Sequence, residues 1–524
     1  MNQSLGNTPG VGTYCDPLTW RSDGLTGQQM VGAIERSGPS SQIAGWPVGT
    51  VASPALPPSR PLFDLGFECL CPDFAFLGAA ANGTGAPLWA AKCTTKCSDT
   101  AGHEVGCDVY AIGTTSQSRG RSPSEQQLFQ PARALPTGRG AANRFPVLDH
   151  GMMTSSAQTL QDPDNGRVLL WQWLPEGDCG NGQQNCSATA TGGKLRDWEG
   201  VQTLPRVVRA SEECHADPAL AGCTLLVQAA PEIQRLQTWR RNTSGLAASG
   251  SGIAVPVDHG PDALHVVARF GPLGGGRAAV VFEGSTRFNV SLIGGAAPAG
   301  VNASSRMMNN TNFGGHNLPD GTSFWPVANA SAARCQAACD ELAACLMWTF
   351  VARARNSSSE AMCCLKGGAI EPPTPEAGCV SGVKDPGTYR LPPSITVGPG
   401  WRHSPRSVPM QLRETLSCQL PPALAGTSSH TELDIYVDHS IVEVFTSTGH
   451  CAFAVRVYQE AQQPKPQPCN TPPRTIRTVV TGSRGAGGSG HGGGVAATTA
   501  ASLEVFGMAA AYRDYRPPPV LSAT

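Results

Sequence analysis

The stretch SSAQTLQDPDNGRVLLWQWL (155–174) contains two short runs with strand composition on either side of a turn. RVLLWQWL (167–174) is rich in aromatic and branched apolar residues, whereas QDPDNG (161–166) combines residues that favour tight turns. Similar runs recur through residues 1–225 without a sustained 3.6-residue apolar period, for example PLWAAKC (87–93) and CDVYAIG (107–113). Short strands joined by turns predict an all-β fold of the sandwich, barrel or propeller type.

The composition supports this prediction and excludes several functions. The chain has 524 residues, enough for two or three domains, and its 61 glycines and 44 prolines favour turns over helices. Only 15% of the residues are charged and the net charge is −1. This balance argues against nucleic acid or an anionic membrane as the main partner. No stretch approaches the roughly 18 apolar residues of a membrane span.

A second all-β region is predicted from residue 226 onward. Its expected strands are ALHVVARFG (263–271), AAVVFEG (278–284), ELDIYVDHSIVEVF (432–445) and CAFAVRVY (451–458). The last two runs are joined by TSTGH and predict a β-hairpin. Three segments are expected to be loops because of their Gly, Pro and Ser content: 114–144, 463–474 and 481–494.

A cysteine-rich segment interrupts the second region. ARCQAACDELAACLMWT (333–349) is the clearest helix candidate, with Cys335 and Cys339 at i and i+4 on one face. With Cys345, Cys363, Cys364 and Cys379, six cysteines fall close together, the density of a small disulfide-stapled unit. Six cysteines allow 15 pairings, so the sequence assigns none.

The cysteine count also indicates the compartment. Nineteen cysteines and nine N-glycosylation sequons favour an oxidising, secretory location. The sequons start at Asn2, Asn82, Asn185, Asn242, Asn289, Asn302, Asn309, Asn329 and Asn356. Zinc binding by pairs such as Cys69/Cys71 or Cys93/Cys97 is the alternative, but no second CxxC or HxxxH completes a tetrahedral set. Residues 1–14 lack the features of a signal peptide, so we expect the natural N-terminus to lie upstream.

The most informative chemical context is FECLCPDFAFL (67–77). Glu68 is flanked by Phe67 and cysteines, with few charges nearby. An apolar setting raises a carboxyl pKa and keeps the acid protonated, as a general acid for glycoside hydrolysis requires. The alternative is a solvated Glu at the end of a strand, without a catalytic role.

FECLCPDF (67–74) resembles the W-E-C-P-D-F motif of glycoside hydrolase family 32. Four further matches follow in the family's order. They are DVYAIGT (108–114), VLDHGMMTSSAQTLQDPDNGRVLLWQWL (147–174), WEGVQTLPRVV (198–208), and YVDHSIVEVF (436–445) with RVY (456–458) and SLEVFGM (502–508). Five motifs in order, covering nearly the whole chain apart from the cysteine-rich insertion, indicate a relative of this family.

The resemblance implies a five-bladed β-propeller followed by a β-sandwich, and cleavage of β-fructofuranosides such as sucrose or fructan with retention. It assigns the acid/base role to Glu68 and stabilisation of the transition state to Asp16 in YCDPLTW (14–20). No metal or organic cofactor is implied. The expected location is the cell wall, the extracellular space or the vacuole.

Three departures from the family pattern bear on catalysis. The nucleophilic Asp of the N-D-P-N-G motif is expected about a hundred residues before Asp16, so we interpret the chain as N-terminally truncated. QDPDNG (161–166) is not a substitute, because Asp162 follows Glu68 and fits a turn between strands.

Cys15 replaces the Arg of the family's R-D-P motif, which removes a fixed cation. Leu70 and Cys71 are inserted within E-C-P, which is expected to shift Glu68 along the strand or to turn it to the other face. If the alignment is instead anchored on CPDF, Leu70 occupies the position of the catalytic Glu and acid catalysis is lost. In addition to these three departures, Ser155 stands where an aromatic sugar-site residue is usual.

The insertion at about 313–390 resembles the PAN/apple type through CQAACDELAACLMWTFV (335–351) and CCLKGG (363–368). Such modules bind proteins or carbohydrates; the alternative is a spacer without a ligand, with Trp348 and Phe350 as its core. The predicted domains are a partial propeller (1–225), a sandwich in two parts (226–312 and 391–524) and this insertion.

Two functions follow from these features. The first is a retaining β-fructofuranosidase that acts on sucrose or fructan. The second is a catalytically inactive relative that binds carbohydrate.

Overall fold

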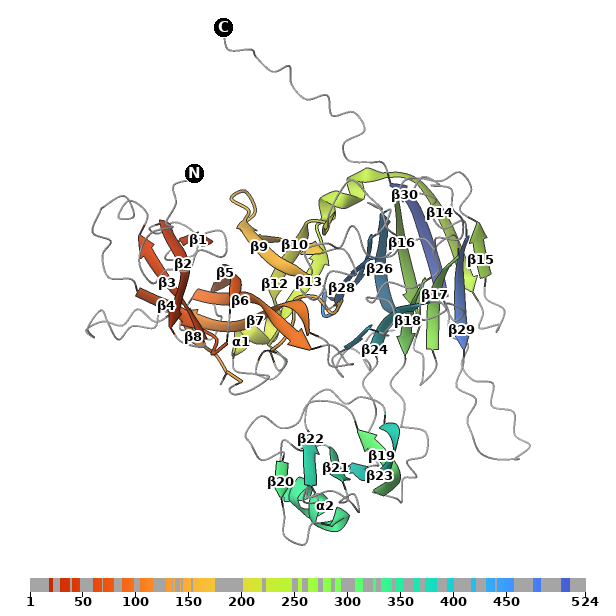
Figure 1. The fold of residues 1–524 in the computed structure, drawn as a ribbon. Helices are drawn as coiled ribbons and strands as arrows, with labels where there is room; N and C mark the ends of the chain where they lie inside the picture. Colours follow the sequence, from red (N-terminus) through yellow and green to blue (C-terminus); the bar gives the residue numbers. More distant parts are fainter. Residues whose placement is uncertain are drawn as a thin grey trace, which may run out of the picture.

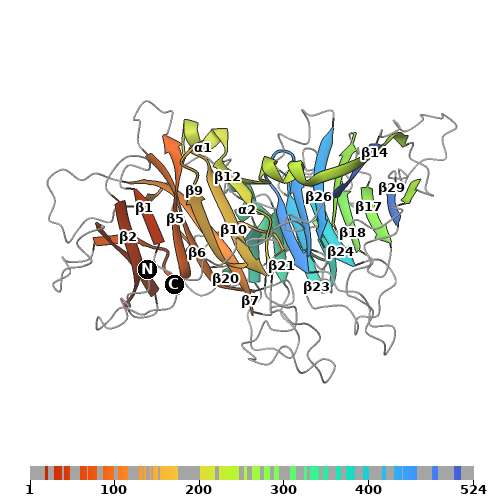
Figure 2. The same ribbon diagram turned by 90° about the horizontal axis from the view of Figure 1, so that it is seen from above.

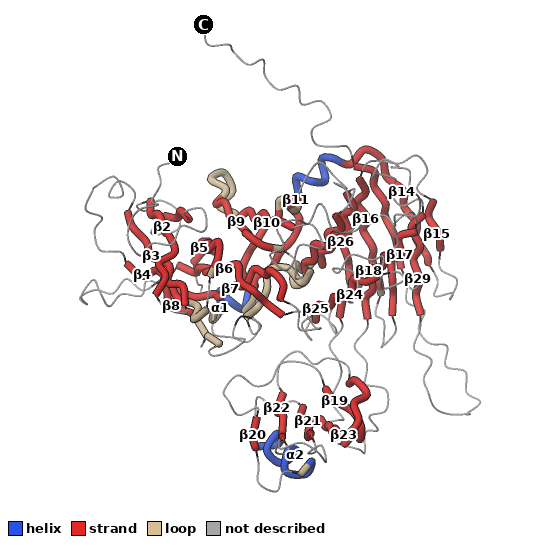
Figure 3. The backbone as a smooth tube through the Cα atoms, in the orientation of Figure 1, coloured by secondary structure: helices blue, strands red, loops and turns tan. Residues whose placement is uncertain are grey.

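The structure is a computed structural model, and it describes 31 segments of the chain. These are residues 18–21, 29–37, 40–47, 60–67, 69–79, 87–98, 104–115, 129–133, 135–136, 142, 145–151, 154–174, 201–218, 223–246, 253–256, 263–271, 277–283, 288–293, 307–313, 324–326, 331–341, 345, 347–351, 362–366, 373–383, 394–399, 416–420, 430–438, 441–456, 475–481 and 501–508. The predicted mostly-β class is confirmed, since strands form nearly all the regular structure (Figure 3).

The first half of the chain forms three antiparallel sheets in sequence order (Figure 1). The first sheet contains β1 (Leu18–Arg21), β2 (Gln29–Ser37), β3 (Ser40–Pro47) and β4 (Arg60–Asp64). The second contains β5 (Leu70–Ala79), β6 (Pro87–Ser98), β7 (Glu104–Thr115) and β8 (Phe129–Pro131). The third contains β9 (Ser155–Gln161), β10 (Val168–Leu174), β11 (Val201–Gln202), β12 (Arg206–Ala210) and β13 (Leu225–Ala229). The five-bladed propeller stays a prediction.

Two six-stranded sheets form a sandwich in the second half. The inner sandwich sheet has the order β14 (Gln237–Leu246), β30 (Ala501–Met508), β16 (Ala263–Phe270), β26 (Thr431–Asp438), β27 (Ile441–Thr446) and β28 (Ala452–Arg456). The outer sandwich sheet has the order β15 (Ile253–Pro256), β29 (Thr475–Thr481), β17 (Arg277–Glu283), β18 (Phe288–Ile293), β24 (Ser394–Pro399) and β25 (Leu416–Gln419). One apolar core, with Phe270, Phe282 and Phe453 fully buried, fills the space between the sheets.

Two predictions for these strands are refined. The run 432–445 is two strands, β26 and β27, because the chain reverses between Asp438 and Ile441 and the two strands pair. The hairpin across TSTGH is confirmed, with Phe445 opposite Ala452 in the β27–β28 pair. The predicted loop 114–144 contains strand β8, whose Phe129 is fully buried, so part of this stretch belongs to the second sheet. Residues 463–474 and 482–494 lie outside the described residues.

The cysteine-rich segment forms a separate sheet beside one helix (Figure 1). Its strands run in the order β19 (Met307–Phe313), β23 (Pro373–Val383), β21 (Met347–Val351), β22 (Met362–Lys366) and β20 (Phe324–Pro326), with α2 (Ala332–Glu341) packed against them. The helix predicted over 333–349 is therefore too long. Cys339, within the helix, forms a disulfide with Cys345, which lies beyond the end of the helix. The next residues, MWTFV (347–351), are aromatic or β-branched for the most part and form β21.

The core of this unit matches one alternative from the sequence. Trp348 is fully buried and packs with Cys335, Cys339 and Leu365, and Phe350 packs against the same cluster. Trp348 is thus a core residue and not an exposed sugar platform. The PAN/apple assignment and the four domain boundaries stay predictions.

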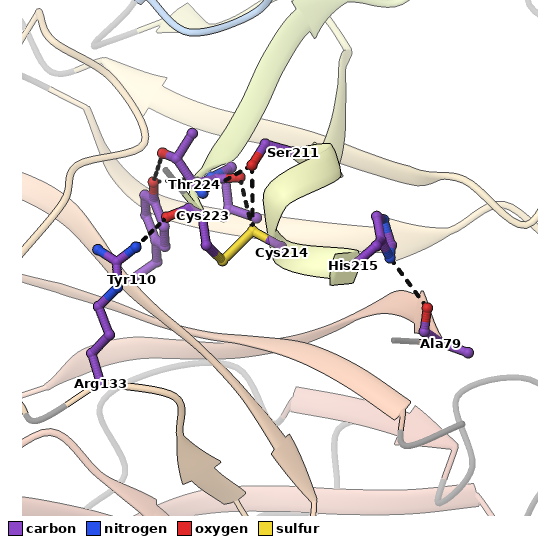
Figure 4. The surroundings of a disulfide bond; sticks show 9 residues. Ala79, Tyr110, Arg133, Ser211, Cys214, His215, Cys223 and Thr224 are labelled. Carbon is purple, nitrogen blue, oxygen red and sulfur yellow. Dashed lines mark hydrogen bonds between the residues drawn. A yellow bond between two sulfur atoms is a disulfide. The ribbon is translucent and has the colours of Figure 1, made fainter. Parts of the chain in front are cut away.

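A disulfide closes the connection between β12 and β13 at the short helix α1 (Glu212–Ala216), before the 3-10 helix η3 (Pro231–Leu236), and hydrogen bonds beside it join the second sheet to the third (Figure 4). Cys214 bonds to Cys223. The Tyr110 hydroxyl lies 2.7 Å from Thr224 Oγ1, and Arg133 donates to the Cys223 carbonyl. These contacts fix the third sheet against the second.

The third sheet also packs on the inner sandwich sheet, and Figure 2 shows the two side by side. Tyr436, Phe445, Ala452 and Met508 of the sandwich share one apolar cluster with residues of the second and third sheets. Among the described residues, no helix has the length and apolar character needed to span a bilayer. Six disulfides join described cysteines, which favours the secretory pathway.

Candidate functional site

Both predicted catalytic residues, Glu68 and Asp16, lie outside the described residues. The residues on either side of position 68 are described. Cys69 is buried and bonded to Cys93, and the Phe67 ring lies edge-on to Phe145 with 5.1 Å between centroids. Phe67 and Cys69, the described neighbours of position 68, are therefore both packed against other residues just before β5.

Strand β5 contains a bulge immediately after this segment. In its pairing with β6, Leu70 lies opposite Thr94 and Asp73 opposite Lys92, so β5 has one residue more than its partner. Cys71 has a φ of 43°, in the left-handed region that non-Gly residues rarely adopt. The residues inserted within E-C-P are thus accommodated by a bulge, a feature that re-aims side chains and is common next to active sites.

Strand β9 contains a matching bulge. Trp171 lies opposite Gln158 and Trp173 opposite Ser155, which leaves one extra residue on β9. Ser156 has a φ of 55°, and its Oγ lies 3.3 Å from Cys71 Sγ. We call Cys71 and Ser156 with their distorted backbone the paired bulges. Ser155, where the motif resemblance predicts an aromatic residue, is half-buried at the start of β9.

A buried carboxylate, Asp73, also joins β5 and β9. Its Oδ2 accepts a hydrogen bond from the Thr159 amide at 2.6 Å, and its Oδ1 one from the Phe74 amide. Burial raises the pKa of Asp73, although Lys92 and these hydrogen bonds oppose the shift. Asp73 belongs to the C-P-D-F part of the motif and holds neighbouring strands together.

A buried polar cluster lies behind the paired bulges. The Ser156 amide donates to Thr94 Oγ1 at 2.9 Å, and Thr94 donates to Asp108 Oδ1 at 2.5 Å. Lys92 Nζ lies 3.5 Å from Asp108 and donates to the Ala157 carbonyl. Lys92 and Asp108 are both almost completely buried, so each charge is compensated by the other.

The cluster continues to the sandwich through Gln172 and Arg206. Gln172 Nε2 donates to Asp108 Oδ2, and Gln172 Oε1 accepts from Arg206 at 2.6 Å. The Arg206 guanidinium also binds Asp149 at 2.7 Å and Glu443 at 2.6 Å. Glu443 is on β27, so one arginine of the third sheet joins it to the sandwich.

Burial and charge oppose each other in this cluster. Burial raises the pKa of both Asp149 and Glu443, and Arg206 acts against that shift. For Arg206, burial lowers the pKa, but Glu443 and Asp149 more than offset it, so the pKa of Arg206 is raised. Every carboxylate oxygen of the two acids accepts at least one hydrogen bond. The arrangement is therefore a satisfied buried ionic network.

Asp162 has the structural role expected from the sequence. Its carboxylate accepts hydrogen bonds from the Asp164 amide, the Asn165 side chain and Arg167, in the turn between β9 and β10. These bonds lower the pKa of Asp162 to about 2. It therefore stabilises a turn.

The cysteines considered for zinc are engaged in disulfides. Cys69 bonds to Cys93, Cys97 bonds to Cys107, and Cys71 is also disulfide-bonded. A thiol in a disulfide does not coordinate zinc as a thiolate, so these pairs hold strands together instead.

Sequence reasoning did not single out five residues of the buried network, although four of them lie within the quoted family motifs. The available signal was a charged residue inside an otherwise apolar strand or motif. These residues are Lys92, Asp108, Asp149, Arg206 and Glu443.

Comparison with known proteins agrees with the geometry. The family described as "Glycosyl hydrolases family 32 C terminal" matches residues 402–480. Among curated proteins, none matches the chain. The fold is similar to that of a variant of fructan 1-exohydrolase IIa from Cichorium intybus in complex with 1-kestose, at 15% identity and a TM-score of 0.50, over 96% of this chain and 73% of that one. It is also similar to fructofuranosidase from Schwanniomyces occidentalis complexed with fructose, at 10% identity and a TM-score of 0.50, over 97% of this chain and 74% of that one.

These findings define a β-rich glycosidase fold with a family 32 C-terminal domain. Residues 402–480 thus match the C-terminal domain of glycosyl hydrolase family 32, and the chain has a fold similar to those of a fructan exohydrolase and a fructofuranosidase, in agreement with the family that the order of its motifs indicated.

Proposed function

We propose that this protein hydrolyses β-fructofuranosidic bonds of sucrose or fructan with retention of configuration. The observation that carries the proposal is the match of residues 402–480 to the family 32 C-terminal domain, in a chain that has the fold of a fructan exohydrolase. The motif FECLCPDF (67–74) adds support, because it leads into β5, the strand that lies beside β9.

In the proposed mechanism Glu68 protonates the leaving sugar and then deprotonates the attacking water. The buried Cys69 and the apolar Phe67 beside it favour a protonated carboxyl at position 68. Asp16 hydrogen-bonds sugar hydroxyls more strongly as the ring flattens towards the oxocarbenium-like state. The family's nucleophile, the Asp of N-D-P-N-G, attacks the anomeric carbon, and retention requires its carboxyl group to lie about 5–5.5 Å from the acid/base carboxyl group.

The experiment measures fructose release from sucrose, inulin and levan by the protein and by its Glu68→Gln variant. It uses the 524-residue chain and a version that includes any coding sequence upstream of Met1. We expect activity in one of the two forms and a loss of at least about 100-fold in the variant. Asp162→Asn is the matched control, since Asp162 belongs to a turn and its loss is expected to leave kcat unchanged.

A second function is favoured by the site's departures from the family. The paired bulges and Ser155 alter the strands that flank the predicted site, which fits a relative that binds carbohydrate without cleaving it. If both forms are silent on all three substrates but bind fructose-containing sugars in calorimetry, this binding function replaces the hydrolase.

A further inference from the structure

We propose that Glu443 of the sandwich is a positioning residue for the fructosidase site, acting through a continuous chain of hydrogen bonds that is buried as far as Thr94 and partly buried where it ends at the paired bulges. The inference rests on the proposed function, because it assigns the site to the start of β5. Its links join residues from three different sheets. In order they are Glu443, Arg206, Gln172, Asp108, Thr94, Ser156 and Cys71.

The sandwich end of the chain is rigid because it is multiply bonded. Glu443 accepts from Arg206 Nε and Nη2 through one oxygen and from the Leu204 amide through the other. Asp149 holds the other side of the guanidinium and accepts the amides of Gly151 and Ala454. The planar fork of Arg206 therefore has one orientation, and that orientation presents Nη1 to Gln172.

Gln172 bridges Arg206 and Asp108, so that the position of Asp108 depends on that of Arg206. Its oxygen is occupied by Arg206, so its Nε2 must point the other way, and it donates to Asp108 and to Thr154. Thr154 directly precedes β9. The amide of Gln172 thus fixes both the carboxylate behind the bulge and the residue before it.

Asp108 in turn fixes the bulge on β9. Its Oδ1 accepts from Thr94 and from the Ala157 amide, while Thr94 accepts the Ser156 amide. Ser156 contacts Cys71, three residues after the predicted acid/base Glu68. A left-handed serine costs free energy and persists only where its surroundings hold it, and this network supplies those contacts.

The test compares Glu443→Gln with Glu432→Gln as matched control. Glu432 is also a sandwich carboxylate paired with an arginine, Arg269, but it is about one-third exposed and outside the chain of bonds. Two readouts are used: kcat and KM on the substrate identified above, and amide hydrogen exchange at residues 155–159. For Glu443→Gln we expect kcat to fall about tenfold with KM nearly unchanged, and exchange at Ser156 and Ala157 to accelerate about tenfold.

The two readouts separate the proposals. If the unmodified protein cleaves no fructoside, the proposed function fails, and exchange still decides whether Glu443 holds the bulge. If it is active but Glu443→Gln matches Glu432→Gln in kcat, the positioning role is overturned while the fructosidase stands. Exchange at Ser156 unchanged by Glu443→Gln overturns the positioning role in either case. Thermal unfolding of each variant confirms that the compared proteins are folded.

A separate observation supports a second inference. The structure assigns N-linked glycosylation to Asn242, in the sequon Asn242-Thr243-Ser244. Asn242 is exposed on β14, which ends the order of the inner sandwich sheet and pairs with β30 on one side. An exposed edge strand invites pairing with other chains, and a bulky polar glycan there prevents it.

Asn289 provides the contrast within the same sandwich. Its sequon, Asn289-Val290-Ser291, lies on β18 with Asn289 only 4% exposed and Ser291 fully buried. A glycan at Asn289 is incompatible with this packing.

At Asn242 the side-chain nitrogen has room to bond to the anomeric carbon of the first sugar. The nitrogen loses a proton in this step, and the lipid diphosphate of a lipid-linked oligosaccharide donor is released.

The experiment expresses the full chain behind a cleavable secretion leader in a eukaryotic host. Folded protein from the medium or the secretory lumen is deglycosylated enzymatically in heavy-oxygen water, which marks each formerly glycosylated Asn, and peptides are read by mass spectrometry. A mark at Asn242 and none at Asn289 supports the inference, and Asn242→Gln is expected to lose one glycan. An unmarked Asn242 or a marked Asn289 in folded protein overturns it.

Discussion

Two arginines of the third sheet make the same contacts in different surroundings. Arg206 binds Asp149 and Glu443, and all three side chains are 2% exposed or less. Arg167 binds Asp162 and Glu232 with distances of 2.8 and 2.6 Å, but its side chain is 23% exposed and that of Glu232 is 44% exposed. Because both arginines form two ion pairs, burial and not the number of ion pairs determines how much such a cluster contributes to the free energy of unfolding.

The physical reason is the cost of desolvation. Around Arg206 water is excluded, so removing one partner leaves uncompensated charge in a medium of low dielectric constant. Around Arg167 water and salt replace a lost partner at little cost. The pKa shifts agree, because burial raises the pKa of Asp149 and Glu443, whereas hydrogen bonds lower the pKa of Asp162 to about 2.

The largest effect is expected from Arg206→Ala. The substitution leaves Asp149 and Glu443 buried without a cation, and we expect a loss of about 3 to 5 kcal/mol in the free energy of unfolding. Urea unfolding followed by tryptophan fluorescence measures the loss. An effect no larger than that of Arg167→Ala would mean that water reaches the junction and that the comparison fails.

A smaller, pH-dependent effect is expected from Asp162→Asn. The folded pKa of about 2 lies below the unfolded value, so this carboxylate stabilises the folded state above the unfolded pKa and stops doing so as the pH falls towards 2. We expect the variant to unfold a few degrees lower than the parent protein at pH 7, roughly 2 °C. Scanning calorimetry from pH 7 to pH 2 should show the difference shrink below about pH 4. A constant difference would indicate that the turn depends on shape and not on charge.

The smallest effect is expected from Arg167→Ala. Because this pair is partly exposed, we expect a change in the unfolding midpoint of no more than about 1 °C, which disappears in 1 M salt. Differential scanning fluorimetry with and without salt measures it. The same salt series on Arg206→Ala should leave its defect almost unchanged, which makes salt the sharpest way to separate the two clusters.

Much of the fold could be predicted from local patterns. The strand composition and the turn residues of 155–174 predicted β9, β10 and the turn between them, and CAFAVRVY predicted β28 and its hairpin. Local rules failed where a covalent bond intervened. The helix expected over 333–349 ends at Glu341, because the Cys339–Cys345 disulfide redirects the chain.

The candidate site was predicted only in part. The motif around Glu68 resembles that of family 32, and β5 begins two residues after Glu68. The sequence showed the insertion of Leu70 and Cys71 but not its consequence, because a bulge is defined by register against a partner strand. The opposing bulge at Ser156 comes from a segment 85 residues away.

The sequence by itself indicated many of the strands, the resemblance to family 32 and the residues with which catalysis is proposed, since these follow from local composition and from motifs in a fixed order. Only the tertiary structure decided which charges are buried together. Lys92, Asp108, Gln172, Arg206 and Glu443 are separated by up to hundreds of residues, and no short-range pattern relates them. They meet because three sheets pack on one another, and an ion excluded from water needs a partner wherever the fold can supply one.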